Sequence, residues 1–137
     1  MNWLLDTGPL VAYLDSADRQ HARVTPAFDA FRGRLVTSGA VITEAMFLLG
    51  DAPGGPALLA DFIGASGARV YDLAQAPELK EAALLMERYS DTPMDYADAT
   101  LVLLSEALRI DTVLTLDRRG FSTYRTRSRK PLKLVLD

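Results

Sequence analysis

Four carboxylates stand apart from the other acidic residues because their surroundings in the sequence are apolar. Asp6 and Asp117 each directly follow a short apolar run, and Glu44 and Asp98 lie in apolar stretches with helical spacing. If parallel strands end at one edge of a sheet, acids placed after them share a crevice. Uncompensated carboxylates there repel one another and hold protons. A hard divalent cation relieves the repulsion, and an all-oxygen site favours Mg²⁺ or Mn²⁺ over zinc or copper.

Each of these acids also has a structural explanation. Asp6 and Asp117 can form turns or cap helices, and Glu44 can be a solvated glutamate. Asp98 lies on a helix with apolar or small residues on nearly every face, at a position expected beyond the first turn, so capping does not explain it. A carboxylate there should be paired, hydrogen-bonded or bound to metal. Asp95, three residues earlier, is either a further ligand or part of a capping box with Thr92.

The convergence of these acids indicates a chemistry for the chain. Carboxylate-held Mg²⁺ with open water positions suits phosphodiester hydrolysis, because the metal activates a water and stabilises charge on the phosphate. The chain has no cysteine and one histidine, His21, which excludes disulfide scaffolds, cysteine nucleophiles and multi-histidine metal sites within one chain. His21 is therefore given no catalytic role.

Composition predicts one ordinary globular domain spanning residues 1–137. The chain is 49% hydrophobic and 24% charged, with a net charge of −3. No uncharged apolar run reaches the roughly 18 residues of a membrane span, and the first residues lack the basic region of a secretory signal. We therefore expect a cytoplasmic protein with no membrane partner.

The elements that must position these acids alternate along the chain. Strands are predicted at residues 2–5, 34–37, 69–73, 112–116 and 132–136. Helices are predicted from residue 9, at 18–31, from Ser38 as N-cap to 49, and at 57–63, 77–89 and 93–109. This alternation predicts an α/β fold with a parallel sheet covered on both faces.

The positive charge is concentrated near the end of the chain. Seven basic residues and no acid lie between residues 118 and 133: Arg118, Arg119, Arg125, Arg127, Arg129, Lys130 and Lys133. Such asymmetry marks either a surface for a polyanion or a solvated loop.

Four motifs in order resemble the PIN-domain ribonucleases, and within them the VapC-type toxins of toxin–antitoxin pairs. They are LLDTGPLVAYLD with Asp6, VITEAMFLL with Glu44, MDYADATLVLLSEAL with Asp98 and Asp95, and VLTLDRRGF with Thr115 and Asp117. The resemblance implies a three-layer α/β/α domain with a central parallel sheet. It also implies a Mg²⁺- or Mn²⁺-dependent endoribonuclease, a cognate antitoxin and a homodimer. One departure is Gly120, where many relatives carry an acid before the motif's phenylalanine.

The resemblance assigns roles to the matching residues. Asp6 and Asp98 would be the main metal ligands, and Glu44 and Asp117 would complete the catalytic acids, with Asp95 a peripheral ligand or a cap. Thr115 would bind water or phosphate, or serve structurally. RNA would be bound by the basic stretch, through Arg118, Arg119, Arg125, Arg127, Arg129 and Lys130.

Three rival interpretations remain open. The Asp6-Thr7-Gly8 triplet resembles that of aspartic proteases, but those place it in an all-β fold, whereas Pro9 here indicates a strand followed by a helix. A nucleic-acid- or protein-binding module could keep this fold without catalysis. A PIN nuclease could also act in RNA processing rather than as a toxin, and a neighbouring antitoxin gene would distinguish these cases.

Overall fold

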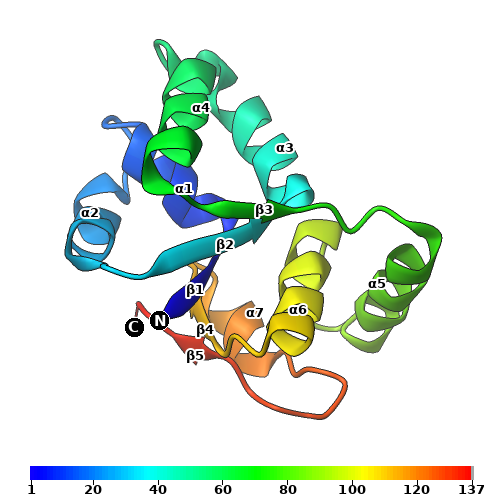
Figure 1. The fold of residues 1–137 in the computed structure, drawn as a ribbon. Helices are drawn as coiled ribbons and strands as arrows, with labels where there is room; N and C mark the ends of the chain where they lie inside the picture. Colours follow the sequence, from blue (N-terminus) through cyan, green and yellow to red (C-terminus); the bar gives the residue numbers. More distant parts are fainter. Residues whose placement is uncertain (137) are drawn as a thin grey trace.

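A five-stranded parallel sheet forms the centre of the molecule, in a computed structural model that describes residues 1–136 (Figure 1). The strand order is β3-β2-β1-β4-β5, and each neighbouring pair is parallel. The strands are β1 (Asn2–Leu5), β2 (Arg34–Ser38), β3 (Arg69–Tyr71), β4 (Thr112–Leu114) and β5 (Lys133–Leu134). The chain leaves β1 toward β2 on one side and later returns to pair β4 on the other, so a ligand crevice is expected beyond the carboxyl ends of β1 and β4.

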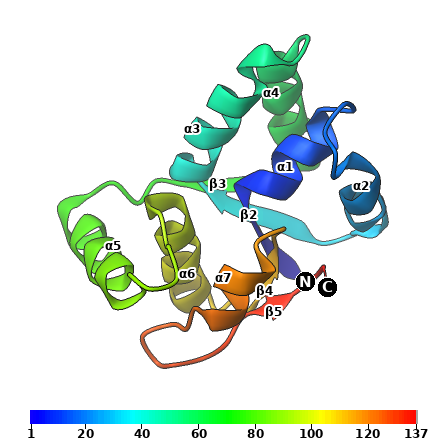
Figure 2. The same ribbon diagram turned by 180° about the vertical axis from the view of Figure 1, so that it is seen from behind.

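The helices cover both faces of this sheet, which confirms the predicted three-layer α/β/α fold. Figures 1 and 2 show α1 to α4 gathered on one side, with α5, α6 and α7 on the other. Their bounds are α1 (Thr7–Leu14), α2 (His21–Ala30), α3 (Gly39–Leu48), α4 (Gly55–Ser66), α5 (Ala76–Arg88), α6 (Tyr96–Leu108) and α7 (Arg118–Thr123), with a short 3-10 helix, η1 (Leu49–Asp51), after α3.

Three predicted strands are longer than the observed ones. The strand predicted at 69–73 ends at Tyr71, because the Asp72 side chain accepts a hydrogen bond from the N–H of Ala74 and turns the chain. The strand predicted at 112–116 ends at Leu114, where Thr115 makes a similar turn by accepting from the N–H of Asp117. The last strand pairs only at residues 133–134 of the predicted 132–136.

Several helix bounds differ from the predictions: the helix predicted at 18–31 begins only at His21, and the one predicted at 57–63 spans Gly55–Ser66. The helix predicted at 93–109 begins at Tyr96, so Asp98 lies in its first turn. The part of the basic stretch that begins at Arg118 is helical, since α7 starts there with Asp117 as its N-cap. Ser38 is the N-cap of α3, as predicted, and its side chain accepts from the N–H of Val41.

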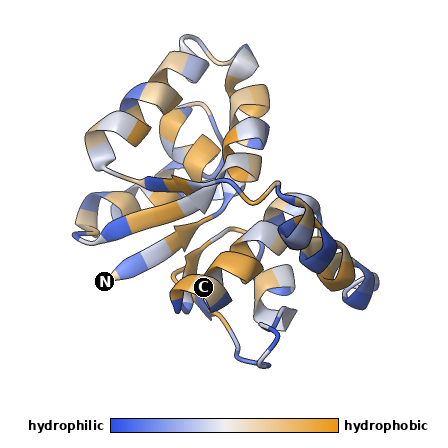
Figure 3. Cartoon of the chain, turned by 45° about the vertical axis from the view of Figure 1, so that its right-hand side comes forward, coloured by the Kyte–Doolittle hydropathy of each residue, from blue (hydrophilic) through white to orange (hydrophobic). Residues whose placement is uncertain are grey.

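The core is built from the central strands and α6. Leu4 and Leu5 of β1 and Leu114 of β4 are fully buried, and Leu101 of α6 packs with them. Figure 3 shows hydrophobic residues concentrated along the strands and the helices that cover them. Burying each such leucine stabilises the fold by about 1.5–3 kcal/mol. This packing holds α6 against the carboxyl ends of β1 and β4. Within residues 1–136, no helix has the length and apolar character needed to cross a membrane.

Candidate active site

Asp6 lies immediately beyond β1, where the sequence placed it, and is almost fully buried at 8% exposure. Its Oδ1 accepts a hydrogen bond of 2.8 Å from the N–H of Thr7, which caps α1. Its Oδ2 accepts 2.7 Å from the hydroxyl of Thr115. The pKa of Asp6 is raised to about 6, mainly by burial and to a smaller extent by the charges of Asp95 and Glu44. The two hydrogen bonds act in the opposite direction and lower it.

Thr115 joins the ends of β1 and β4. Its hydroxyl donates to Asp6 and accepts, at 2.9 Å, from the N–H of Asp117. Asp117 is exposed, and its Oδ1 caps α7 by accepting 3.0 Å from the N–H of Gly120. The threonine therefore has the structural role that the sequence left open, and it sets the spacing between two of the predicted catalytic acids.

Asp95 and Asp98 cap α6 together. The N–H of Asp98 donates 2.8 Å to Asp95 Oδ1, and the N–H of Asp95 donates 3.1 Å to Asp98 Oδ2. The expectation that capping does not explain Asp98 is wrong, and so is the predicted box with Thr92. The box lies three residues later because the helix begins at Tyr96 rather than at Pro93.

Capping occupies only part of the hydrogen-bonding capacity of Asp95 and Asp98. The box uses one oxygen of each, and no hydrogen bond within residues 1–136 occupies the other. Burial, followed by the charges of Asp6 and Asp95, raises the pKa of Asp98 to about 8. A cap on a solvated helix would keep an ordinary pKa, so the environment of Asp98 is that of a crowded acidic site.

Glu44 approaches the same centre from α3. It is half-buried, and its charge contributes to the raised pKa of Asp6. The placement of α3 against α6 depends on a buried hydrogen bond of 2.7 Å between the hydroxyls of Ser38 and Thr100. Thr100 was missed by the sequence analysis, which weighed only charged groups on this helix.

Tyr124, also missed, borders the acids from the far end of α7. Its hydroxyl donates 2.7 Å to the carbonyl of Pro93, and its side chain is fully buried. Burial, with the nearby charges of Asp98 and Asp117, raises its pKa well above the ordinary value. It therefore stays protonated and fixes the segment that leads into the Asp95–Asp98 box. The only signal in the sequence was its helical spacing from Phe121.

The donor set fits a divalent cation. The three ion pairs formed within residues 1–136 lie elsewhere, between Arg127 and Glu81, Arg127 and Glu106, and Lys133 and Asp111. The acids of the site are thus uncompensated by lysine or arginine, and their free oxygens are the ligands that Mg²⁺ or Mn²⁺ takes. In the same part of the chain no three histidine, aspartate or glutamate side chains already stand in a metal-holding arrangement.

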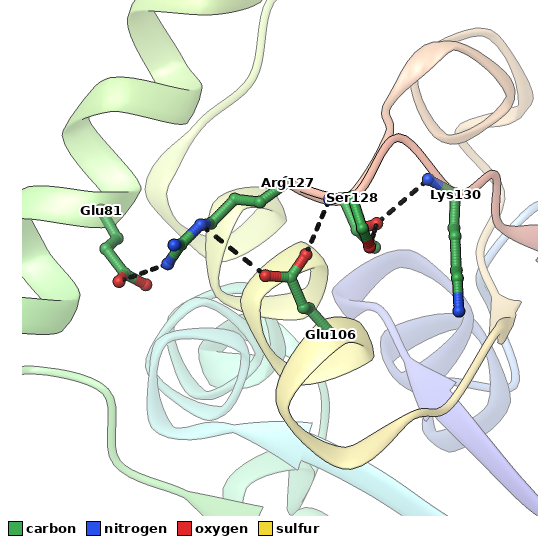
Figure 4. A network of polar contacts seen from close by, with 6 residues as sticks. Glu81, Glu106, Arg127, Ser128 and Lys130 are labelled. Atoms are coloured by element: carbon green, nitrogen blue, oxygen red, sulfur yellow. Dashed lines mark hydrogen bonds and ion pairs between the residues drawn. The ribbon is translucent and has the colours of Figure 1, made fainter.

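The predicted RNA-binding residues fall into two groups. Arg118 and Arg119 open α7, directly after Asp117. Arg127 lies farther away, with its guanidinium 2.7 Å from Glu81 and 3.7 Å from Glu106, and Glu106 also accepts from the N–H of Ser128 (Figure 4). Glu106 is eight residues along α6 from Asp98, which corresponds to about 12 Å.

His21 has a structural contact. Its Nδ1 lies 2.7 Å from the carbonyl oxygen of Ala12, which joins the start of α2 to α1. This contact gives the histidine a structural role.

Comparisons with known proteins agree with this geometry. A family model described as "PIN domain" matches residues 3–126. Ribonuclease VapC26 of Mycobacterium tuberculosis is 37% identical over 124 residues, which cover 89% of this chain and 91% of that protein. The crystal structure of Mycobacterium tuberculosis VapC20, described as a sarcin–ricin loop cleaving toxin, superposes with a TM-score of 0.73 at 18% identity, over 82% of this chain and 87% of that one. At that identity the second likeness is one of fold.

Proposed function

The chain belongs to the PIN-domain family, and we propose that it is a divalent-metal-dependent endoribonuclease that acts as the toxin of a toxin–antitoxin pair. The observation that carries the proposal is the uncompensated pair Asp6 and Asp98, each with a raised pKa, where β1 ends and α6 begins. The relative that is 37% identical over most of both chains bears the name of a ribonuclease. In this proposal residues 1–137 act as one PIN domain.

The roles of the acids follow from their positions. Asp6 and Asp98 would hold the ion, and Asp95 would add a peripheral ligand through the oxygen that capping leaves free. A bound cation supplies Lewis acidity to the phosphate and lowers the pKa of water. Glu44 and Asp117 would position the attacking water, whose oxygen bonds to phosphorus as the bond to the leaving oxygen breaks. The proton that the water loses would pass to a carboxylate, and the leaving oxygen would take a proton from solvent. Mg²⁺ and Mn²⁺ both suit this all-oxygen set, so both are proposed.

The RNA strand must approach an acidic centre on a chain of net charge −3. Arg118 and Arg119 directly follow Asp117 at the start of α7, and we assign them the phosphates beside the cut bond. Arg125, Arg129 and Lys130 lie farther along the chain and would bind flanking phosphates. Arg127 was proposed for the same role, but an RNA phosphate would have to compete with Glu81 and Glu106 for its guanidinium.

The proposed partners are a cognate antitoxin protein and a second copy of the chain. The place of action is the cytoplasm, where cellular RNA is found. An RNA-processing nuclease would share the same acids and differ in its partner. A small protein encoded beside this chain that binds it and blocks cleavage supports the toxin, and cleavage that no such protein affects supports processing.

The test of the nuclease is cleavage of total cellular RNA by the purified protein with Mg²⁺, with Mn²⁺ and with EDTA. Discrete cleavage products are expected with the metals and none with EDTA. The matched control is Asp98→Asn prepared identically, because it excludes a contaminating nuclease. Equal cleavage by the control, or cleavage that persists in EDTA, would overturn the proposal.

A further inference from the structure

An arginine-lined depression lies where the end of α5 meets the segment that follows α7. It has a volume of about 460 Å³ and is lined by Arg88, Tyr89, Arg125 and Arg129. The lining consists of three arginines and one tyrosine and includes no acid. We name this surface the arginine groove. Arg88 and Tyr89 are separated from Arg125 and Arg129 by more than thirty residues of sequence. The sequence therefore contained no indication that Arg88 lies beside the basic stretch.

Two of the three guanidiniums are available to a ligand. Arg88 and Arg129 are exposed, and neither forms a salt bridge with any residue from 1 to 136. Arg127, only two positions from Arg129, is the contrast, because Glu81 and Glu106 neutralise it. Arg88 also borders the depression that holds Glu81 and the paired Arg127, and Lys130, outside the groove, is a further exposed residue without an ion pair among residues 1–136.

The groove is built on a fixed backbone. Arg125 Nη1 donates to the carbonyls of Ser122, Thr123 and Tyr124 at 2.9, 3.1 and 2.9 Å, and its N–H donates 2.9 Å to the hydroxyl of Tyr89. The following turn is closed by hydrogen bonds between Thr126 and Lys130 and from Arg129 to Thr126, which hold Arg129 at a φ of 64°. Such preorganisation lowers the entropy lost when a ligand binds.

The groove adjoins the acids through one buried side chain. Tyr89 packs edge-on against Tyr124 with ring centroids 5.2 Å apart. Tyr124 in turn hydrogen-bonds Pro93, just ahead of the Asp95–Asp98 box. A strand with a phosphodiester at the acids would thus have its neighbouring phosphates beside the groove.

We propose that the arginine groove binds the sugar–phosphate backbone of single-stranded RNA next to the cleavage site, with Arg88 and Arg129 contacting phosphates. Guanidinium forks match phosphate oxygens, and alternating arginines and an aromatic ring are typical of single-strand channels. This inference rests on the proposed ribonuclease function and adds the path of the substrate to it.

The test compares two double variants in the Asp98→Asn background, where RNA is not consumed. Arg88→Gln with Arg129→Gln removes the two available charges. Arg19→Gln with Arg69→Gln is the matched control, because it removes two exposed arginines outside the groove. Arg125 is kept because it caps α7. Binding of a fluorescent single-stranded RNA is measured by anisotropy over a salt series with Mg²⁺ present.

The groove variant is expected to bind at least about tenfold more weakly than the control, with a salt slope smaller by about 1.4, or 0.7 for each lost phosphate contact. In the native background it should raise KM more than it lowers kcat. Equal affinity and slope for the two double variants, with unchanged thermal midpoints, would overturn the inference and leave the ribonuclease intact. If the Asp98→Asn parent itself binds no RNA and the native chain cuts none, the proposed function fails and the groove proposal falls with it.

Discussion

Asp98 caps α6 and, in the proposed function, would also hold the metal with the same carboxylate. One oxygen accepts from the N–H of Asp95, which stabilises the start of α6, and the other is left for a ligand. Asn is nearly as effective as Asp in capping, so the two roles can be separated by removing charge at constant shape. Burial, followed by the charges of Asp6 and Asp95, raises the pKa of Asp98, as expected for a carboxyl in a crowded acidic site.

Asp98→Asn is expected to lower Mg²⁺-dependent RNA cleavage by on the order of a hundredfold or more while the fold persists, because the amide can still accept the capping hydrogen bond. Asp6→Asn should behave in the same way, and Asp95→Asn should have a smaller effect. Cleavage rates and circular dichroism of the three variants check this. A folded Asp98→Asn protein with native activity would remove the acid from the site.

Thr115→Val should weaken metal binding and cleavage and lower the free energy of unfolding by about 1–3 kcal/mol. The valine leaves Asp6 Oδ2 without its donor and removes the acceptor for the N–H of Asp117. Thr115→Ser keeps the hydroxyl and is the control. Isothermal titration with Mn²⁺ and thermal unfolding measure both effects. If valine and serine prove equivalent, the hydroxyl does not position Asp6.

At the scale of the elements, strands and helices were predictable where apolar periodicity and the turn residues agreed. Ser38 was placed correctly as a cap because a hydroxyl precedes an apolar run. The start of α6 was misplaced because Pro93 suits a first helical turn, yet here its carbonyl accepts from Tyr124, a residue 31 positions away. Asp6 and Asp117 lie after β1 and β4, and Glu44 and Asp98 lie on helices, as predicted, while their catalytic roles stay predictions. Tyr124, Thr100 and Arg88 act through contacts made only in the folded chain.

Gly120 packs closely against Asp117 and Tyr124, and substitutions can test this packing. A Cβ there would stand 2.3 Å from Asp117 Oδ2 and 2.9 Å from the Tyr124 hydroxyl, so Gly120→Ala should destabilise the protein by about 1–3 kcal/mol and lower cleavage. Gly64 in α4 has nothing within 4 Å of such a Cβ. Gly64→Ala should therefore stabilise by about 0.5–1 kcal/mol through helix propensity alone. Denaturant unfolding of both variants should give opposite signs, and two stabilising changes would mean that Asp117 is not held as described.

At the scale of the whole molecule, the proposed metal site would cost the fold stability in the absence of the ion. The folded chain holds Asp6 with a pKa of about 6 and Asp98 with a pKa of about 8, against an ordinary value of 3.8. Between about pH 4 and pH 8 the native state therefore binds more protons than the unfolded state. The free energy of unfolding must fall as pH rises through this window, because deprotonation places unpaired charge in the site.

Without metal, the thermal midpoint is expected to rise as pH is lowered from 8 to 5, and Asp98→Asn should reduce this dependence. Mg²⁺ or Mn²⁺ should bind the folded state and raise the thermal midpoint at pH 7.5. At a metal concentration a hundredfold above Kd, the free energy of unfolding should increase by about 2.7 kcal/mol. In EDTA at that pH, Asp98→Asn should unfold at or above the native midpoint. Scanning calorimetry at matched ionic strength measures each. A native midpoint indifferent to metal, with Asp98→Asn destabilised, would make these acids purely structural.

The strand order has a consequence for how the protein is made. β1 is translated first but lies at the centre of the sheet, and its partner β4 begins at Thr112. At 5–20 residues per second, Asp6 waits roughly 5–20 s for Thr115 to be synthesised. Pairing so distant in sequence makes folding slow, and Asp6 and Asp117 can come together only after β4 has been made. Ribosome-bound chains arrested before β4 should thus be protease-sensitive and unable to cut RNA, so synthesis itself delays the onset of activity.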